Sequence, residues 1–163
     1  MPQKPNMEKY NRYVQLKGDL KKAMAAGFYY QAIFIEYAIM EDRCWSALEH
    51  AGVECLTKTG KDIGIVQKLD RMQKRKEFSD KLSQKYFTGE FFEALRSWIK
   101  DRNTYIHKLA RETFNPEHLR ELAEEGKRLQ ERLSYCVRRV NEYHDAQKAI
   151  DQKANENEKG DSR

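Results

Sequence analysis

Residues 91–111 read FFEALRSWIKDRNTYIHKLAR, and this stretch indicates both the class of fold and the place of its chemistry. Apolar residues recur in it at steps of three and four, the period of one face of an α-helix. They are Phe91, Leu95, Trp98, Ile99, Tyr105, Ile106 and Leu109. Arg102 lies in the middle of this stripe. Because a guanidinium stays charged, a buried Arg102 requires an anionic partner, either a carboxylate of the chain or an external anion such as phosphate.

The same periodicity predicts further helices at residues 7–25, 28–50, 61–78 and 116–150. Between them we expect a break at Gly27, a loop over residues 51–60 and a polar connection over residues 79–88. The 8 glycines and 3 prolines supply little of the turn chemistry that an all-β fold needs. We therefore predict an all-α fold, an up-and-down bundle of four to five helices with a long C-terminal helix.

Two residues have the side chains that favour helix starts. Thr88 precedes the helix that carries Arg102, and Asn115 precedes Pro116 at the start of the last helix. Thr and Asn cap free backbone N–H groups, and Pro fits the first helical position. The last helix carries a heptad-like seam, which consists of Leu119, Leu122, Gly126, Leu129, Leu133, Cys136, Val140 and Tyr143.

Length and composition favour one domain over residues 1–150, followed by a polar, disordered tail over residues 151–163. The net charge of +5 is compatible with an acidic partner, but the charge is spread along the helices rather than clustered. Neither a signal peptide nor an apolar run of membrane-spanning length is found, so we expect no membrane partner. The 3 cysteines match no zinc or redox spacing, which favours reduced thiols in a cytoplasmic protein.

Glu36 is a second charged residue on an apolar stripe. Ile33, Ile39, Ala32 and Met40 surround it at helical spacing. We hypothesise that it forms a salt bridge with Arg102. In the simplest interpretation that salt bridge is purely structural, and His107 is a partly exposed histidine without a role.

A distinctive motif follows from Arg102. Asn103 comes directly after it, and His107 lies four residues beyond Asn103 on the same helix face. This sequence, RNTYIH, resembles the Rx4-6H signature of the HEPN superfamily, which favours a polar residue after the Arg. The long last helix and the wide apolar face of residues 28–50 are also similar to that fold.

The resemblance implies a metal-independent endoribonuclease, often a toxin or an anti-phage defence protein, that acts on RNA as a homodimer. It also implies that Arg102, Asn103 and His107 are catalytic. His107 would transfer protons during attack of the RNA 2′-OH on the adjacent phosphate, and Arg102 would bind that phosphate. The residues that we expect to bind substrate or support the motif are Glu36, Tyr105, Lys108 and Arg111. We predict no cofactor, and the 4 histidines form no familiar metal-ligand spacing.

Helix geometry adds one constraint. His107 lies five positions after Arg102, so an ideal helix places the two side chains roughly 140° apart. A homodimer removes the difficulty, because the Arg of one subunit can approach the His of the other. The resemblance to toxins is also compatible with an antitoxin or another protein as a partner. Two alternatives stay open. One is a non-catalytic HEPN-like module that pairs with a protein partner or binds a nucleotide or anion, and the other is a helical interaction protein that uses its heptad seam.

Overall fold

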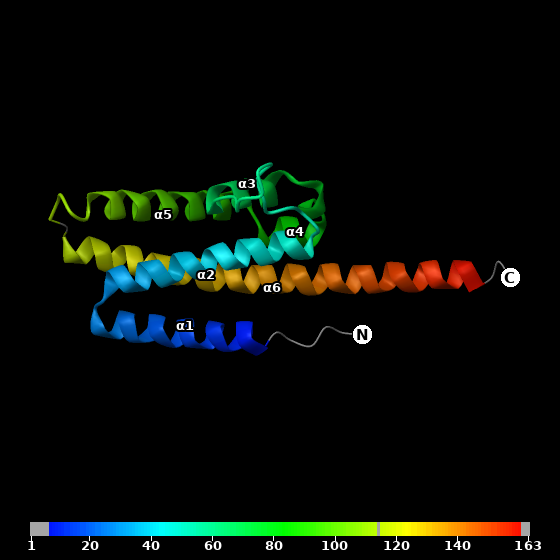
Figure 1. Ribbon diagram of the computed structural model, residues 1–163, viewed down its shortest axis with the longest axis horizontal. Coiled ribbons are helices and arrows are strands. Elements are labelled where there is room, and N and C mark those ends of the chain that lie inside the picture. Colours follow the sequence, from blue (N-terminus) through cyan, green and yellow to red (C-terminus); the bar gives the residue numbers. More distant parts are fainter. Residues whose placement is uncertain (1–6, 114, 161–163) are drawn as a thin grey trace. The chain divides into compact units, whose positions relative to one another are not determined.

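The computed structural model describes residues 7–113 and 115–160, with side chains described up to Ala154. Within these residues the chain is built of helices (Figure 1). They are α1 (Met7–Ala26), α2 (Tyr29–His50), α3 (Ile65–Lys74), the 3-10 helix η1 (Lys76–Phe78), α4 (Lys81–Tyr86), α5 (Gly89–Lys108) and α6 (Pro116–Gly160). The predicted all-α class and the long C-terminal helix are confirmed.

The break predicted at Gly27 is a helix C-cap. Gly27 has φ 73°, a left-handed conformation that a residue with a Cβ adopts with strain. Its N–H donates to the carbonyl of Met24 at 3.3 Å, and the N–H of Phe28 donates to the carbonyl of Ala23 at 2.8 Å. This is the Schellman pattern, which ends α1 and lets α2 begin two residues later.

The two predicted N-caps are also confirmed. Thr88 Oγ1 accepts a hydrogen bond from the N–H of Phe91 at 3.2 Å, at the start of α5. Asn115 Oδ1 accepts one from the N–H of Glu117 at 2.9 Å, at the start of α6. Each cap satisfies a backbone donor that has no partner inside its helix.

The helix predicted over residues 61–78 is shorter than expected. Residues 57–61 form a turn, in which the N–H of Thr57 donates to the carbonyl of Lys61 at 2.7 Å. Gly64 is the N-cap of α3, and its N–H donates to Gln67 Oε1 at 3.2 Å. The prediction was wrong here because the apolar period continues through Ile63, whose N–H instead bonds to the carbonyl of Cys55 at 3.1 Å.

The polar connection predicted over residues 79–88 contains the short helix α4. Its N-cap is Asp80, whose Oδ1 accepts a hydrogen bond from the N–H of Ser83 at 2.9 Å. At the other end of the chain, α6 runs past its predicted end at Ile150 to Gly160. The disorder predicted for residues 151–163 stays a prediction, and residues 161–163 lie outside the described part of the chain.

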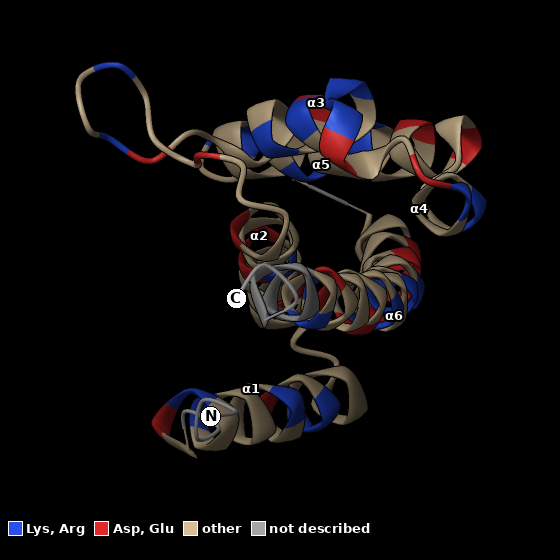
Figure 2. Ribbon diagram, turned by 90° about the vertical axis from the view of Figure 1, so that its right-hand side faces the viewer, with Lys and Arg blue, Asp and Glu red and all other residues tan. Residues whose placement is uncertain are grey.

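The chain divides into two compact units, although the sequence favours one domain. Unit 1 comprises the described residues of Met1–Ile39 and Ser97–Gln130, and unit 2 those of Met40–Arg96 and Glu131–Arg163. Unit 1 therefore holds α1, the first part of α2, the last part of α5 and the first part of α6. The motif Arg102, Asn103 and His107 belongs to unit 1. Lys and Arg positions are interspersed with Asp and Glu positions along the ribbons of α1 and α6 (Figure 2).

The core of unit 1 depends on a glycine. Gly126 lies in the apolar seam of α6, and a Cβ built on it would come within 2.2 Å of Glu36 Oε2 and 2.6 Å of the Trp98 ring. The Trp98 indole donates from Nε1 to the carbonyl of Leu122 on α6 at 2.8 Å. The missing side chain of Gly126 therefore makes room for Glu36 of α2 and Trp98 of α5.

Unit 2 uses polar pairs among its helices as well as an apolar core. Lys68 is buried, and its Nζ lies 3.2 Å from Glu41 Oε1 and 5.2 Å from the centre of the Trp45 ring. His144 Nε2 lies 3.2 Å from Asp80 Oδ2, the carboxylate that caps α4. These contacts attach α3 to α2, and α4 to α6.

Replacing Gly126 by Ala tests the close packing in unit 1. We expect Gly126→Ala to lower the free energy of unfolding by about 1–3 kcal/mol, because the rigid Trp98 ring cannot move aside without repacking. Gly18→Ala in α1 is the matched control, since nothing lies within 4 Å of its added Cβ. It should raise stability by about 0.5–1 kcal/mol. Urea denaturation measures both, and a Gly126→Ala protein as stable as the wild type would contradict the packing described.

Candidate functional site

Arg102 is positioned by aromatic rings of α2. Its Cζ lies 4.1 Å from the centre of the Tyr37 ring and 5.2 Å from the centre of the Phe34 ring. Its Nη1 donates to Asn103 Oδ1 at 2.9 Å. A guanidinium over a ring face is attracted by the ring's quadrupole and keeps its full charge. Two rings and an amide therefore orient a half-buried cation in unit 1.

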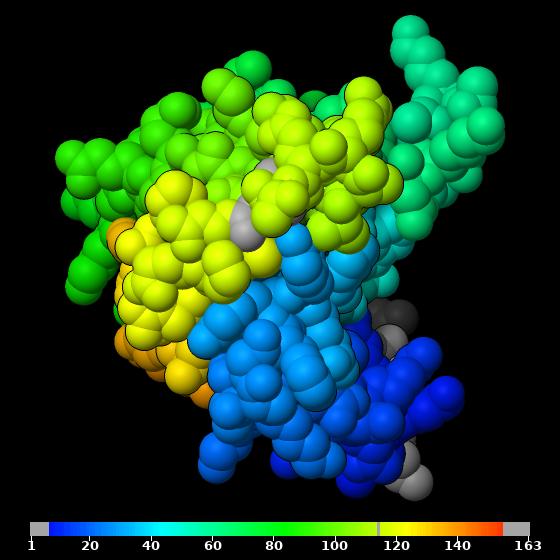
Figure 3. Space-filling model, turned by 90° about the vertical axis from the view of Figure 1, so that its left-hand side faces the viewer, coloured from blue at the N-terminus to red at the C-terminus, as the bar shows by residue number. Residues whose placement is uncertain are grey.

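Asn103 and His107 extend the site toward the end of α5. Asn103 is half-buried and is engaged with Arg102, whereas His107 is exposed in the last turn of the helix. No hydrogen bond or ion pair to His107 is formed by the described residues. Figure 3 views the molecule from the side where the α1–α2 turn, the residues after α5 and the start of α6 reach the surface of unit 1.

The predicted salt bridge between Glu36 and Arg102 is wrong. Both carboxylate oxygens of Glu36 are buried, and neither has a hydrogen-bond partner in the described chain. The reason is that consecutive side chains of α2 point in directions about 100° apart around the helix axis, so Glu36 and Tyr37 face different neighbours. Tyr37 is turned to Arg102, and Glu36 is turned to Gly126 and Trp98.

The environment of Glu36 changes its ionisation. Its side chain is 0% exposed. Burial disfavours the carboxylate and raises its pKa from 4.5 to about 8, while the positive charge of Lys127 acts in the opposite direction. Glu36 is therefore mainly a neutral carboxylic acid at neutral pH. A neutral acid can pack against Trp98 without the large cost of an isolated buried charge.

The other expected supporting residues occupy different environments. Tyr105 is half-buried and close to Tyr30, whose pKa is raised by burial and by the Tyr105 phenol. Lys108 is exposed, and its Nζ lies 3.2 Å from Glu112 Oε1. Arg111 is exposed beyond the end of α5. The structure thus brings Arg102 and Asn103 into contact and separates Glu36 from them.

Sequence reasoning missed the role of Phe34. Tyr30, Phe34 and Tyr37 recur at steps of four and three, so they share one face of α2. This pattern resembles an ordinary core stripe, yet Phe34 is 49% exposed. One signal could have indicated this role. Phe34 is an aromatic residue beside the apolar stripe of α2, and α2 is the helix whose side chains contact Arg102.

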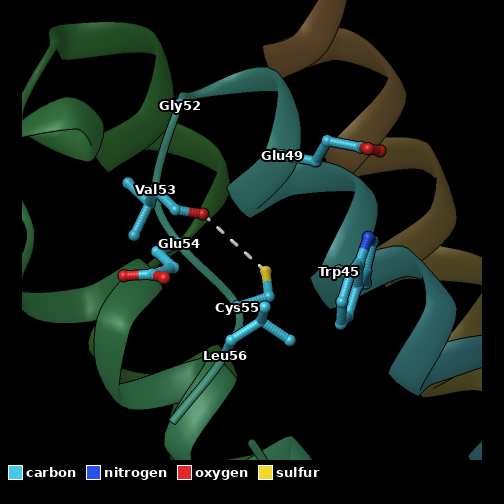
Figure 4. Close-up of a pocket in the computed structure, with 7 residues that line it drawn as sticks. All are labelled: Trp45, Glu49, Gly52, Val53, Glu54, Cys55 and Leu56. Atoms are coloured by element: carbon cyan, nitrogen blue, oxygen red, sulfur yellow. Dashed lines mark hydrogen bonds between the residues drawn. The ribbon is translucent and has the colours of Figure 1, made fainter. Parts of the chain in front are cut away.

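Unit 2 contains a separate hollow of about 350 Å³. It lies between the end of α2 and the loop that follows, and Figure 4 shows the Cys55 thiol donating a hydrogen bond to the carbonyl of Val53, at 3.7 Å. The exposed residues Glu49 and Glu54 also line it. Burial raises the pKa of the Cys55 thiol. All three cysteines are free and buried, which agrees with the prediction of reduced thiols.

Comparison with protein-family models, with curated proteins and with solved structures finds no match for this chain. Within the described residues, no helix is long and apolar enough to cross a membrane. No group of three or more His, Cys, Asp or Glu side chains there is placed to hold a metal ion. Any functional assignment therefore rests on the residues themselves.

The buried acid makes the stability of the protein depend on pH. A raised pKa means that folded Glu36 retains a proton that the unfolded chain releases. Its contribution to stability is fully present below about pH 4.5 and is lost as the pH rises toward 8. We expect a loss on the order of a few kcal/mol across this window. Urea denaturation at several pH values measures it.

The matched variants are Glu36→Gln and Glu49→Gln. The Gln side chain of Glu36→Gln cannot ionise, so the free energy of unfolding of this variant should fall less with rising pH than that of the wild type. Glu49→Gln is the control, because Glu49 is an exposed residue of the same helix, and it should leave the wild-type pH dependence in place. The same slope in wild type and Glu36→Gln would contradict a neutral, buried Glu36.

Proposed function

We propose that this protein is a metal-independent endoribonuclease of the HEPN type, which cleaves single-stranded RNA by attack of a 2′-OH on the adjacent phosphate. The observation that carries the proposal is the arrangement of Arg102. Its guanidinium is held by Tyr37 and Asn103, five positions before an exposed His107 on the same helix. A permanent cation and a titratable imidazole are the two groups that this reaction needs.

Arg102 supplies the electrostatic part of the reaction. Its N–H donors can bind the non-bridging oxygens of a phosphate and offset the charge that develops on them in the transition state. The contacts with Tyr37 and Phe34 fix the direction of the guanidinium before substrate arrives. A cation fixed in advance does not need to reorganise during the reaction, which is how such groups accelerate it.

His107 supplies the proton transfers. As general base it takes the proton of the 2′-OH, and the oxygen attacks the phosphorus atom. The bond from phosphorus to the 5′-oxygen breaks, and that oxygen leaves with the proton that the protonated His107 returns to it as general acid. The products are a 2′,3′-cyclic phosphate and a 5′-hydroxyl, so atoms and charges balance without a cofactor. Imidazole suits this role because it titrates near neutral pH.

We further propose that the active form is a homodimer. Arg102 and His107 lie roughly 140° apart around α5, so a single copy presents them in different directions. A second copy that contributes its own α5 lets the Arg of one subunit and the His of the other approach one phosphate. A toxin or an anti-phage defence protein is the setting that the resemblance implies, with an antitoxin or another protein as a regulatory partner.

A second candidate function is a non-catalytic module that binds RNA, a nucleotide or another anion. The observation that favours it is His107, which no described residue orients through a hydrogen bond. In that case Arg102 is a static anion site. The two functions differ in their products, because a binding module leaves the RNA intact.

Cleavage of labelled single-stranded RNA in EDTA tests the proposal. We expect the wild type to cleave and His107→Ala to lose at least about 100-fold in rate, the usual contribution of a general acid or base. Arg102→Ala should lose a similar or larger factor. His118→Ala is the matched control, since His118 is an exposed histidine at the start of α6 in the same unit.

Each outcome distinguishes between the candidates. Cleavage by wild type and His118→Ala alone supports the ribonuclease. RNA binding without cleavage by the folded wild type would contradict catalysis and favour the binding module. Equal cleavage by all four proteins would show a contaminating nuclease and remove the support from the motif.

A further inference from the structure

Arg102 contacts aromatic rings of α2. Tyr30, Phe34 and Tyr37 lie on one face of α2, and Tyr105 of α5 lies near Tyr30. The guanidinium contacts two of these rings, at 4.1 Å and 5.2 Å from its Cζ to the ring centres. All of these residues belong to unit 1. The cluster therefore combines π faces with a fixed positive charge.

Phe34 is the member of this cluster that is most open to solvent. It is 49% exposed, whereas Tyr30, Tyr37 and Tyr105 are half-buried. Burial of a Phe side chain is favourable, and much of that free energy is not realised while half of the Phe34 side chain faces solvent. Single exposed apolar residues are common on proteins. Phe34 differs from them because the cation of the candidate site contacts its ring.

A ring and a neighbouring guanidinium recognise a specific combination of ligand groups. The ring stacks with a flat aromatic base, and the guanidinium binds the phosphate of the same strand. Sites for single-stranded nucleic acids use this combination, and each stacked base contributes about 1–3 kcal/mol. A base inside a duplex is already stacked with its neighbours, so only an unpaired or extruded base can use the ring.

We propose that Phe34 is a stacking platform for the base next to the phosphate that Arg102 binds, which restricts the substrate to RNA with unpaired bases. This inference rests on the proposed function for the identity of the ligand. It adds a residue of α2 to a site that the motif places on α5 alone. Phe34 acts in substrate binding and takes no part in proton transfer.

Binding of two labelled oligonucleotides tests this inference. One is a single-stranded RNA hexamer, and the other is an abasic ribose–phosphate hexamer with the same charge. Fluorescence anisotropy in EDTA measures both, with the full chain in a His107→Ala background to prevent cleavage. A stacking contribution of about 1–3 kcal/mol predicts that the base-containing strand binds about 5- to 150-fold more tightly.

Three further substitutions in that background separate stacking from general effects. Phe34→Leu keeps an apolar side chain but loses the ring, so we expect the preference for the base-containing strand to fall several-fold. Phe34→Trp should retain the preference. Phe28→Ala is the matched control, because Phe28 is another exposed aromatic residue of unit 1, at 63% exposure. It should leave both affinities unchanged, and circular dichroism should confirm that each variant is folded.

The results separate this inference from the proposed function. An equal preference in Phe34→Leu and in its parent would overturn the stacking role, even if the wild type cleaves RNA. Equal binding of both strands by the parent would overturn it as well. A preference that Phe34→Leu loses would support stacking, even if the wild type does not cleave and the proposed catalysis fails.

Discussion

The close approach of α6 to α2 and α5 at Gly126 is the constraint on which the candidate site depends. Any Cβ at that position would collide with Glu36 and Trp98. Trp98 lies one helical turn before Arg102 on α5, so the packing of its indole fixes the rotation of that helix. The indole is also hydrogen-bonded to the α6 backbone. These two contacts of Trp98 hold α5 in place and so fix the direction in which Arg102 leaves the helix.

The same constraint explains why Glu36 and Arg102 are separate features. A carboxyl group packed against Gly126 and Trp98 is shielded from water, and it stays protonated because ionisation there is costly. Arg102 instead meets π faces, which hold a guanidinium in place without neutralising it. The two ionisable residues on apolar stripes therefore have different roles. Glu36 packs in the core as a neutral acid, and Arg102 carries a partly accessible positive charge.

Much of the fold could be predicted from the sequence because local signals agree with each other. Gly27, Thr88 and Asn115 mark helix ends through interactions that span only a few residues. The parts of the fold that were predicted wrongly depend on contacts that the periodicity of apolar residues does not report. The start of α3 depends on a turn that bonds Ile63 to Cys55, which no periodicity reveals. The short helix α4 depends on an Asp80 cap inside a polar stretch.

The candidate site was predictable only in part, and for the same reason. The motif Arg102, Asn103 and His107 is contiguous, so its residues could be recognised from the sequence. Its surroundings come from α2, far away in the chain, and depend on side-chain directions there. Two anomalous charges on apolar stripes indicated a Glu36–Arg102 pair, but helix rotation turns Tyr37 rather than Glu36 to the guanidinium.

Attack by the RNA 2′-OH is tested most directly by changing the substrate rather than the protein. Once the cut site in an RNA is known, a strand with a single 2′-deoxy or 2′-O-methyl nucleotide immediately before it removes the attacking group. We expect that the wild type no longer cleaves there, while the unmodified strand yields a 2′,3′-cyclic phosphate, which mass spectrometry detects. Cleavage of the modified strand at that position would contradict attack by the 2′-OH and the roles assigned to Arg102 and His107.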